Sequence, residues 1–299
     1  MVGMSQSHQV PVIAIILAAG FGTRFDPARP KQLVSVADRP VIEWTIEAFE
    51  DCPEVTDILV VVNAAVSDAV EKVIDDMGSR KVRGIVPGGE TRADSTRAAL
   101  EFLREYSIPD DAKVLIHDGV RPFVSPKTIL DCVAALDSVN AATVAVPSTD
   151  TILLAAPADA HEGEGSAPAD GGASDSAASD DASSDGAGRF DTSAAPIVRI
   201  VPDRATTYRA QTPQCFRFST ISEAYRRAAG DENFHPTDDT RVVVDYLPDE
   251  PVAVVEGSDD NIKITTRPDL EVAELIAPRA RRVRNYARRR AVQEMTSGM

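Results

Sequence analysis

The stretch from Val12 to Leu33 constrains the fold of this chain more than any other. It opens with an uninterrupted apolar run, Val12 to Leu17, which breaks into the sequence AAGFGTR at residues 18–24. An apolar run of this length indicates a strand that is buried on both faces. Glycines let backbone N–H groups approach a ligand closely, because no Cβ intervenes. A buried strand leading into a glycine turn, with the cations Arg24 and Lys31 behind it, suits a polyphosphate site.

The glycines are not arranged as in the better-known phosphate loops. The stretch has no Gly-Lys pair, which excludes G-x-x-x-x-G-K-[ST], and Arg24 and Phe25 stand where G-x-G-x-x-G would end. Two glycines alone are equally well explained by a simple turn. The two cations favour the phosphate site, because a bare turn does not need a lysine between Pro30 and Gln32.

Strand-like and helix-like segments alternate five times along the first half of the chain. The expected strands cover residues 12–17, 57–62, 82–86, 113–117 and 142–146. This alternation predicts the α/β class, with a mostly parallel, Rossmann-like sheet covered on both faces. Ligands of such sheets bind beyond the carboxyl ends of the strands. The loops after the first, third and fourth strands carry the unusual polar residues of this chain, so we expect a binding site there.

The domain organisation follows from where this alternation stops. We expect a flexible N-terminus at residues 1–10, one domain at residues 11–278 and a basic tail at residues 279–299. Within the domain, two β-like runs form the legs of a β-arm at about residues 147–205, and residues 155–196 form an insertion at its tip. The insertion is rich in Ala, Ser, Gly and Asp and holds nine acidic residues against one arginine, a composition that favours disorder.

Composition excludes several functional classes. A net charge of −16 argues against a general nucleic-acid binder. The seven arginines between residues 279 and 290 are therefore better explained by a solvated helix or by an internal ion-pair partner, which the acidic insertion would supply. The cysteines Cys52, Cys132 and Cys215 lie too far apart for a metal site, which favours buried, reduced thiols.

The N-terminus predicts a cytoplasmic protein. It lacks a basic n-region, and the apolar run that follows ends at Gly20, which is too short for a signal peptide or a membrane span. We expect no membrane partner and no nucleic-acid partner.

Two polar residues end the fourth expected strand. Asp118 is placed to bind Mg²⁺, which keeps several waters and takes its remaining ligands from substrate phosphates. The alternative is an aspartate that caps a helix or a turn. His117 has the chemistry of a base, but packing or a hydrogen bond to the backbone is the better interpretation of a histidine at a strand end.

Seven motifs together resemble one enzyme family. They are LAAGFGTRF…PKQL, PGGETRADS, HDGVRPF, VPSTDTI, PDRATTYRAQTPQCF, TDD and DNIKIT, in this order. The order is similar to that of the 2-C-methyl-D-erythritol 4-phosphate cytidylyltransferases (IspD-type), which have a nucleotidyltransferase fold of the GT-A-like kind. The ribitol-5-phosphate cytidylyltransferases share much of the set. The LAAG form of the first loop and Glu90 resemble the methylerythritol enzymes more.

The resemblance implies a site for two substrates. For CTP binding it implies Ala18, Ala19, Gly20, Gly22, Gly89, Glu90 and Ser95. For catalysis it implies Arg24, Lys31 and Lys263, and for Mg²⁺ it implies Asp118. For methylerythritol phosphate it implies Arg121, Thr151, Arg204 and Thr212. It also implies a homodimer in which the β-arm of one subunit reaches the active site of the other.

The implied function is transfer of CMP from CTP to 2-C-methyl-D-erythritol 4-phosphate, a step of isoprenoid precursor biosynthesis. Two features depart from the family. Val120 stands where the family often has alanine, and the insertion is longer than the family needs. Two alternatives stay open, a ribitol-5-phosphate cytidylyltransferase and a catalytically inactive nucleotide-binding scaffold. The intact Arg24, Lys31 and Asp118 argue against the scaffold, since a decayed copy would have lost some of them.

Overall fold

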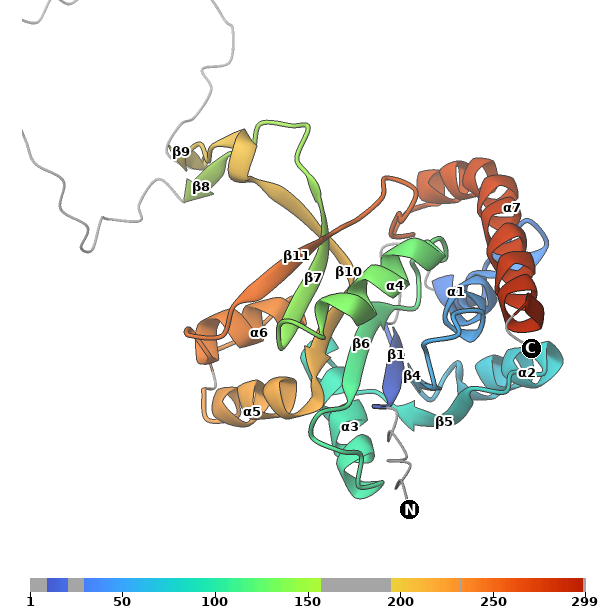
Figure 1. Ribbon diagram of the computed structural model, residues 1–299. Coiled ribbons are helices and arrows are strands. Elements are labelled where there is room, and N and C mark those ends of the chain that lie inside the picture. Colours follow the sequence, from blue (N-terminus) through green and yellow to red (C-terminus); the bar gives the residue numbers. More distant parts are fainter. Residues whose placement is uncertain (1–9, 21–29, 157–194, 232, 298–299) are drawn as a thin grey trace, which may run out of the picture. The chain divides into compact units, whose positions relative to one another are not determined.

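The computed structural model describes residues 10–20, 30–156, 195–231 and 233–297 (Figure 1). The chain divides into two compact units. Residues 1–146 and 209–299 form the first, which we call the core unit, and residues 147–208 form the second, which we call the arm unit. The expected flexible N-terminus and most of the expected insertion lie outside the described residues.

The core unit is built on a seven-stranded sheet with the strand order β11-β7-β10-β6-β1-β4-β5. The strands are β1 (Val12–Ala18), β4 (Asp57–Val62), β5 (Val82–Pro87), β6 (Lys113–Asp118), β7 (Ala141–Pro147), β10 (Tyr208–Arg217) and β11 (Val252–Glu256). Strand β1 pairs in parallel with β4 and with β6, β4 pairs in parallel with β5, and β7 with β11. Within this sheet, β10 is antiparallel to its neighbour β6. The predicted mostly parallel α/β sheet is confirmed.

Helices cover both faces of this sheet (Figure 1). They are α1 (Val41–Glu50), α2 (Ser67–Met77), α3 (Arg92–Glu105), α4 (Pro126–Ala135), α5 (Phe218–Ala228) and α6 (Asp239–Tyr246). Helix α7 (Arg267–Ser297) packs instead in a separate apolar cluster with residues such as Val36 and Trp44. A 3₁₀ turn, η1 (Lys31–Leu33), and a short hairpin of β2 (Ser35–Val36) and β3 (Arg39–Pro40) connect β1 to α1.

Strand β1 explains why its sequence is apolar without alternation. Because successive side chains of a strand point to opposite faces, one set belongs to each layer. Ala14 and Ile16 pack in the layer that includes residues of α1, α2 and α4. Ile13 and Ile15 pack in the layer that includes residues of α3, α5 and α6. Both layers consist of buried apolar side chains, so an apolar residue is favoured at every position of the strand.

The arm unit contains the antiparallel hairpin of β8 (Leu154–Ala156) and β9 (Ile197–Ile200), followed by the turn η2 (Arg204–Thr206). The first of these strands differs from the expectation, since it begins at Leu154 and includes Ala155 and Ala156, which we placed in the insertion, while residues 151–153 are not strand. Large apolar side chains of this hairpin are exposed, among them Leu154 and Ile200. An exposed apolar surface of this kind is typical of a contact region.

Helix α7 continues through the segment that we expected as a separate tail, and it runs to Ser297. The guanidinium of Arg284 is buried and donates to the carbonyl oxygens of Trp44 (2.8 Å) and Pro122 (2.5 Å). Arg288 forms ion pairs with Glu47 (3.0 Å) of α1 and with Asp51 (2.6 Å), which caps the end of α1. Arg279 pairs with Asp260. The arginine-rich segment thus finds ion-pair partners in the core unit.

Candidate active site

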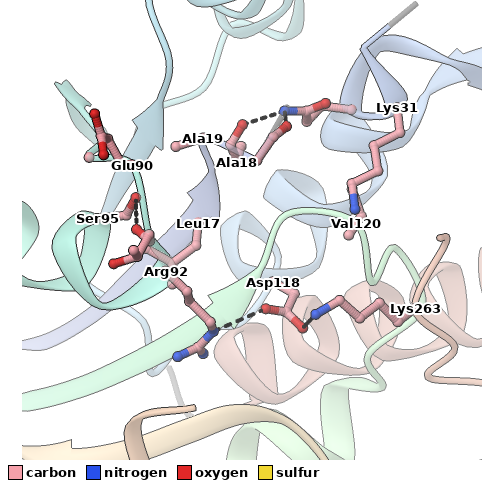
Figure 2. Close-up of a pocket in the computed structure, with 14 residues that line it drawn as sticks. Leu17, Ala18, Ala19, Lys31, Glu90, Arg92, Ser95, Asp118, Val120 and Lys263 are labelled. Carbon is pink, nitrogen blue, oxygen red and sulfur yellow. Dashed lines mark hydrogen bonds and ion pairs between the residues drawn. The ribbon is translucent and has the colours of Figure 1, made fainter. Parts of the chain in front are cut away.

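A pocket opens where β1 and β6 end at the carboxyl edge of the sheet (Figure 2). It is lined by Leu17, Ala18, Ala19, Gly20, Lys31, Gln32, Gly89, Glu90, Thr91, Arg92, Ser95, Asp118, Val120 and Lys263. These residues come from five separate parts of the sequence. The parallel register of β1 and β6, in which Leu17 lies opposite Asp118, brings the first loop and the aspartate to the same edge.

The first loop is held by side-chain amides at its base. The Gln32 amide donates to the carbonyl oxygens of Ala18 (2.5 Å) and Gly20 (2.9 Å). The Asn63 amide donates to the carbonyl oxygen of Ala19 (2.9 Å). Three consecutive peptide units are therefore fixed in orientation. This lowers the conformational-entropy cost of ordering the loop when a ligand binds.

The second wall of the pocket is the glycine pair that precedes α3. A Cβ built on Gly88 would lie 2.4 Å from the Cβ of Ala19, so the Gly88 backbone lies directly against the Ala19 side chain. The Thr91 side chain caps α3 by accepting a hydrogen bond from the Asp94 N–H. The Asp94 side chain accepts one from the Thr91 N–H, and the two bonds form a capping box. The Ser95 hydroxyl donates to the Thr91 carbonyl oxygen (3.0 Å). These hydrogen bonds hold the wall in place through contacts within the protein.

Asp118 lies at the centre of a cluster of cations, which we call the Asp118 cluster: Asp118, Arg92, Arg121 and Lys263. The Asp118 carboxylate lies 3.0 Å from Lys263 Nζ, 3.2 Å from Arg121 Nε and 3.6 Å from Arg92 Nε. Burial alone would raise the pKa of Asp118, but the attraction of Lys263, Arg92 and Arg121 outweighs it and holds that pKa well below its usual value. The aspartate is therefore ionised at every physiological pH.

His117 is buried behind this cluster, with its ring edge against Phe49. The Thr212 hydroxyl accepts a hydrogen bond from the Asp118 N–H (3.1 Å), so it donates to His117 Nδ1 (2.9 Å), and His117 Nε2 donates to the Arg121 carbonyl oxygen (3.0 Å). Burial lowers the pKa of His117 to about 4. A neutral imidazole with both nitrogens engaged is a packing residue, which confirms the interpretation preferred from the sequence.

Most of the residues expected from the sequence come together here. The pocket lining includes Ala18, Ala19, Gly20, Lys31, Gly89, Glu90, Ser95, Asp118 and Lys263. Arg121 and Thr212 lie beside and behind Asp118, so they contact the site from its buried side. Thr151 and Arg204 belong to the arm unit. Gly22 and Arg24 lie outside the described residues.

Sequence reasoning did not assign five residues of the lining to the site: Leu17, Gln32, Thr91, Arg92 and Val120. Of these, Gln32 and Arg92 make the polar contacts described above. Gln32 follows Lys31 directly, and nothing in the local pattern separates it from an exposed polar residue. Arg92 carried a usable signal, because it occupies the first turn of α3, where the helix dipole disfavours a cation. A cation in that position has to be stabilised by carboxylates from elsewhere in the fold.

Comparison with known proteins decides the family. Residues 12–161 and 184–279 match the model of the family described as 2-C-methyl-D-erythritol 4-phosphate cytidylyltransferase. The chain belongs to this family. A 2-C-methyl-D-erythritol 4-phosphate cytidylyltransferase from Bifidobacterium longum (strain DJO10A) is 51% identical over 275 residues, which are 92% of this chain and 83% of the relative. A family member from Thermobifida fusca is 38% identical over 90% of this chain and 95% of its own length.

Solved structures of cytidylyltransferases of this family share the fold. The 4-diphosphocytidyl-2C-methyl-D-erythritol synthase of Anaerococcus prevotii superposes with a TM-score of 0.66 at 27% identity, over 90% of this chain and 99% of that one. The Thermus thermophilus enzyme gives 0.58 at 26% identity, over the same shares of the two chains. A bifunctional ribulose 5-phosphate reductase/CDP-ribitol pyrophosphorylase from Haemophilus influenzae is 32% identical over 88% of this chain and 47% of its own length.

Proposed function

We propose that the protein transfers CMP from CTP to 2-C-methyl-D-erythritol 4-phosphate, giving 4-diphosphocytidyl-2-C-methyl-D-erythritol and pyrophosphate. The observation that carries this proposal is the convergence of both glycine loops, Lys31 and the Asp118 cluster on one pocket of a family member. The 51% identity to a curated enzyme of that activity supports the same substrate pair.

The charges of the pocket suit this reaction. A phosphate monoester oxygen of the acceptor attacks the α-phosphorus of CTP, a new P–O bond forms, and the bond to pyrophosphate breaks. The attacking oxygen is already anionic at neutral pH, so the reaction needs no protein nucleophile. The task of the protein is to hold two anions together and to stabilise the charge that develops at the phosphorus. Lys31 and Lys263 lie in the pocket lining to do so.

We propose that Asp118 holds Mg²⁺ when substrate is bound. Among the described residues there is no group of three metal-binding side chains, so a protein-only cage is not formed there. A single ionised carboxylate suits Mg²⁺ nonetheless, because this ion takes one or two carboxylates together with substrate phosphates and water. When bound, the ion neutralises phosphate charge. The surrounding cations keep Asp118 ionised for this role.

We also propose a homodimer that forms through the β-arm and acts in the cytoplasm. The exposed apolar residues of β8 and β9 support an arm that packs against a second copy. No helix in the described part of the chain is long and apolar enough to cross a membrane. Light scattering of the purified protein tests the dimer, and a monomer at micromolar concentration contradicts it.

The experiment that tests the activity is a pyrophosphate-release assay with CTP and one polyol phosphate at a time. We expect release with 2-C-methyl-D-erythritol 4-phosphate and Mg²⁺, and loss of release when the metal is chelated. The relationship to the CDP-ribitol pyrophosphorylase makes ribitol 5-phosphate the second acceptor to measure. Faster release with ribitol 5-phosphate would reassign the acceptor, and no release with either would favour a nucleotide-binding scaffold.

A further inference from the structure

Arg92 bridges two carboxylates that lie in different surroundings. Its Nε lies 3.6 Å from Asp118 Oδ1 in the pocket, and its Nη1 lies 2.5 Å from Asp239 Oδ2, on the side away from the pocket. Asp239 is fully buried at the start of α6. In Figure 2, Arg92 and Lys263 approach Asp118 from opposite sides.

Asp239 is itself held in place by the core of the protein. The Tyr225 hydroxyl of α5 donates to Asp239 Oδ1 (2.6 Å), and the Asp239 N–H donates to Gln214 Oε1 of β10 (2.8 Å). Burial and the neighbouring Asp239 raise the pKa of Tyr225, so its hydroxyl remains a donor. The guanidinium of Arg92 is thus anchored by residues from α5, α6 and β10, none of which lines the pocket.

The arrangement is not the one that stability alone would favour. Arg92 Nη2 is buried, and within the described part of the chain it has no hydrogen-bond acceptor. A buried cation with an unsatisfied N–H is costly, and well-packed apolar residues in place of a buried ion pair are often as stable or more stable. A pair that carries such a cost calls for a reason outside stability.

The cations of the Asp118 cluster also differ in the conformational freedom of their side chains. The Lys263 side chain is 40% exposed and ends in a compact ammonium on a flexible stem, so it can turn to a ligand phosphate. The Arg92 side chain is 20% exposed, and its planar guanidinium is fixed between two carboxylates. If Lys263 leaves Asp118 for the triphosphate, Arg92 is placed to stay.

We propose that Arg92 is a positioning residue, which Asp239 and Tyr225 hold against Asp118 so that this carboxylate keeps its place and its cation when Lys263 turns to the nucleotide. This inference rests on the proposed function. It assigns to the buried Asp239 and Tyr225 a role in the reaction, although neither residue lines the pocket. Without Arg92, the Asp118 carboxylate loses the partner that fixes its position, and Lys263 is held more strongly at Asp118 and away from the triphosphate.

The decisive variant removes the whole buried network at once. A single protein would carry Arg92→Met, Asp239→Leu and Tyr225→Phe together. Because all three partners are removed, no charge or hydroxyl of this network stays buried without its partner, and the unfolding midpoint should stay near that of the wild type. We expect kcat/KM to fall by about 10- to 100-fold, the usual loss when a group that orients a site residue is removed. The Kd of CTP, measured by calorimetry without acceptor, should rise at least about tenfold on the same reasoning.

A matched control and a remote variant complete the test. Arg104 and Glu101 form an exposed ion pair on the same helix, and replacing both by Gln should change neither kcat/KM nor Kd. Asp239→Asn leaves Arg92 in the pocket but removes its anchor, so kcat/KM should fall in the same direction. Unchanged kcat/KM and Kd in a folded triple variant, or in Asp239→Asn, would overturn the proposal.

The readouts separate this inference from the proposed function. If the wild type releases no pyrophosphate, the proposed function fails, and the Kd of CTP still decides the role of Arg92. Equal Kd values in the wild type and the triple variant overturn the positioning role, as does a wild type that does not bind CTP. Should the triple variant fail to fold, Tyr225→Phe alone, which removes a single hydroxyl, is expected to lower kcat/KM a few-fold, and no change there counts against the proposal.

Discussion

Two clusters of cations in the core unit are each centred on one carboxylate, but the charges around the two carboxylates differ. Asp118 is the centre of the first, and Glu47 of α1 is the centre of the second. Glu47 lies 2.8 Å from Arg39, 3.1 Å from Arg284 and 3.0 Å from Arg288. Each centre is therefore one carboxylate with three basic side chains around it.

The difference lies in the charges that complete each cluster. Around Glu47, the carboxylates of Glu43 and Asp51 also pair with Arg39 and Arg288, so three arginines meet three carboxylates. Around Asp118, three cations, Arg92, Arg121 and Lys263, meet two carboxylates, and the second of these, Asp239, is buried away from the pocket. A balanced cluster binds one helix to another. A cluster with surplus positive charge beside a pocket is suited to an anionic ligand.

Removing a cation from the pocket should have the largest effect. We expect Lys31→Ala to leave the unfolding midpoint unchanged and to lower turnover several hundred-fold, the loss that follows removal of one donor to a transition state. Pyrophosphate release measures it. Lys127→Ala is the control, because Lys127 is an exposed lysine of α4 that forms an ion pair with Asp131, outside the pocket. Near-normal turnover of a folded Lys31→Ala protein would show that the surplus charge is not used.

Acid should weaken the fold through the neutral His117 behind the Asp118 cluster. Its pKa in the folded protein is about 4, below the ordinary value of 6.5, so the unfolded chain binds the proton more readily between these values. Stability is thus fully present above pH 6.5 and falls as the pH drops toward 4, by up to about 3 kcal/mol from this group. Urea unfolding of the wild type and of His117→Asn across this range measures the difference in slope. Parallel curves would contradict a neutral His117.

Breaking the balanced cluster should affect stability and leave the chemistry unchanged. Arg284→Met removes a buried guanidinium with bonds to Trp44, Pro122 and Glu47. Glu47 keeps two arginines, so we expect a loss of about 2 kcal/mol, less than the cost of leaving a buried charge alone. Denaturant unfolding gives the free energy, and turnover at a temperature where the variant is folded should match the wild type. A variant with full stability and reduced turnover would reverse the distinction between the clusters.

The smallest effect is expected at the rim of the balanced cluster. The Arg288 side chain is 47% exposed, and its ion pairs with Glu47 and Asp51 are open to solvent and salt. Arg288→Gln should cost under about 1 kcal/mol of unfolding free energy, and less as salt is added. A loss as large as that of Arg284→Met would mean that the two arginines act as one unit.

The sequence predicts those parts of the fold that depend on local patterns of neighbouring residues. Val12–Ala18 is apolar throughout because both of its faces are covered, and this pattern is legible in one short stretch. Strand β10 was not expected, because Pro213 and the buried Gln211 and Gln214 interrupt the strand pattern. Those polar side chains serve partners such as the Asp239 N–H, which only the folded chain brings near.

The candidate site divides in the same way. Lys31 and Asp118 stand next to glycine turns and strand ends, so their places at the edge of the sheet were predictable. The bond between Arg92 and Asp239 joins residues 147 positions apart, and that from Arg284 to Trp44 spans 240. A local sequence pattern cannot predict contacts between residues so far apart. The sequence neighbours of an arginine therefore do not show whether it will contact a ligand or a helix.

The contact between Gly88 and Ala19 sets a limit on redesign of this pocket. A single Cβ at Gly88 would lie 2.4 Å from the Ala19 Cβ and 2.9 Å from Ser95 Oγ, so no side chain larger than hydrogen fits at residue 88. An engineer who wants to widen this junction can remove only the Ala19 methyl group and the Ser95 side chain. Any wider opening requires moving the end of β1 away from the loop between β5 and α3.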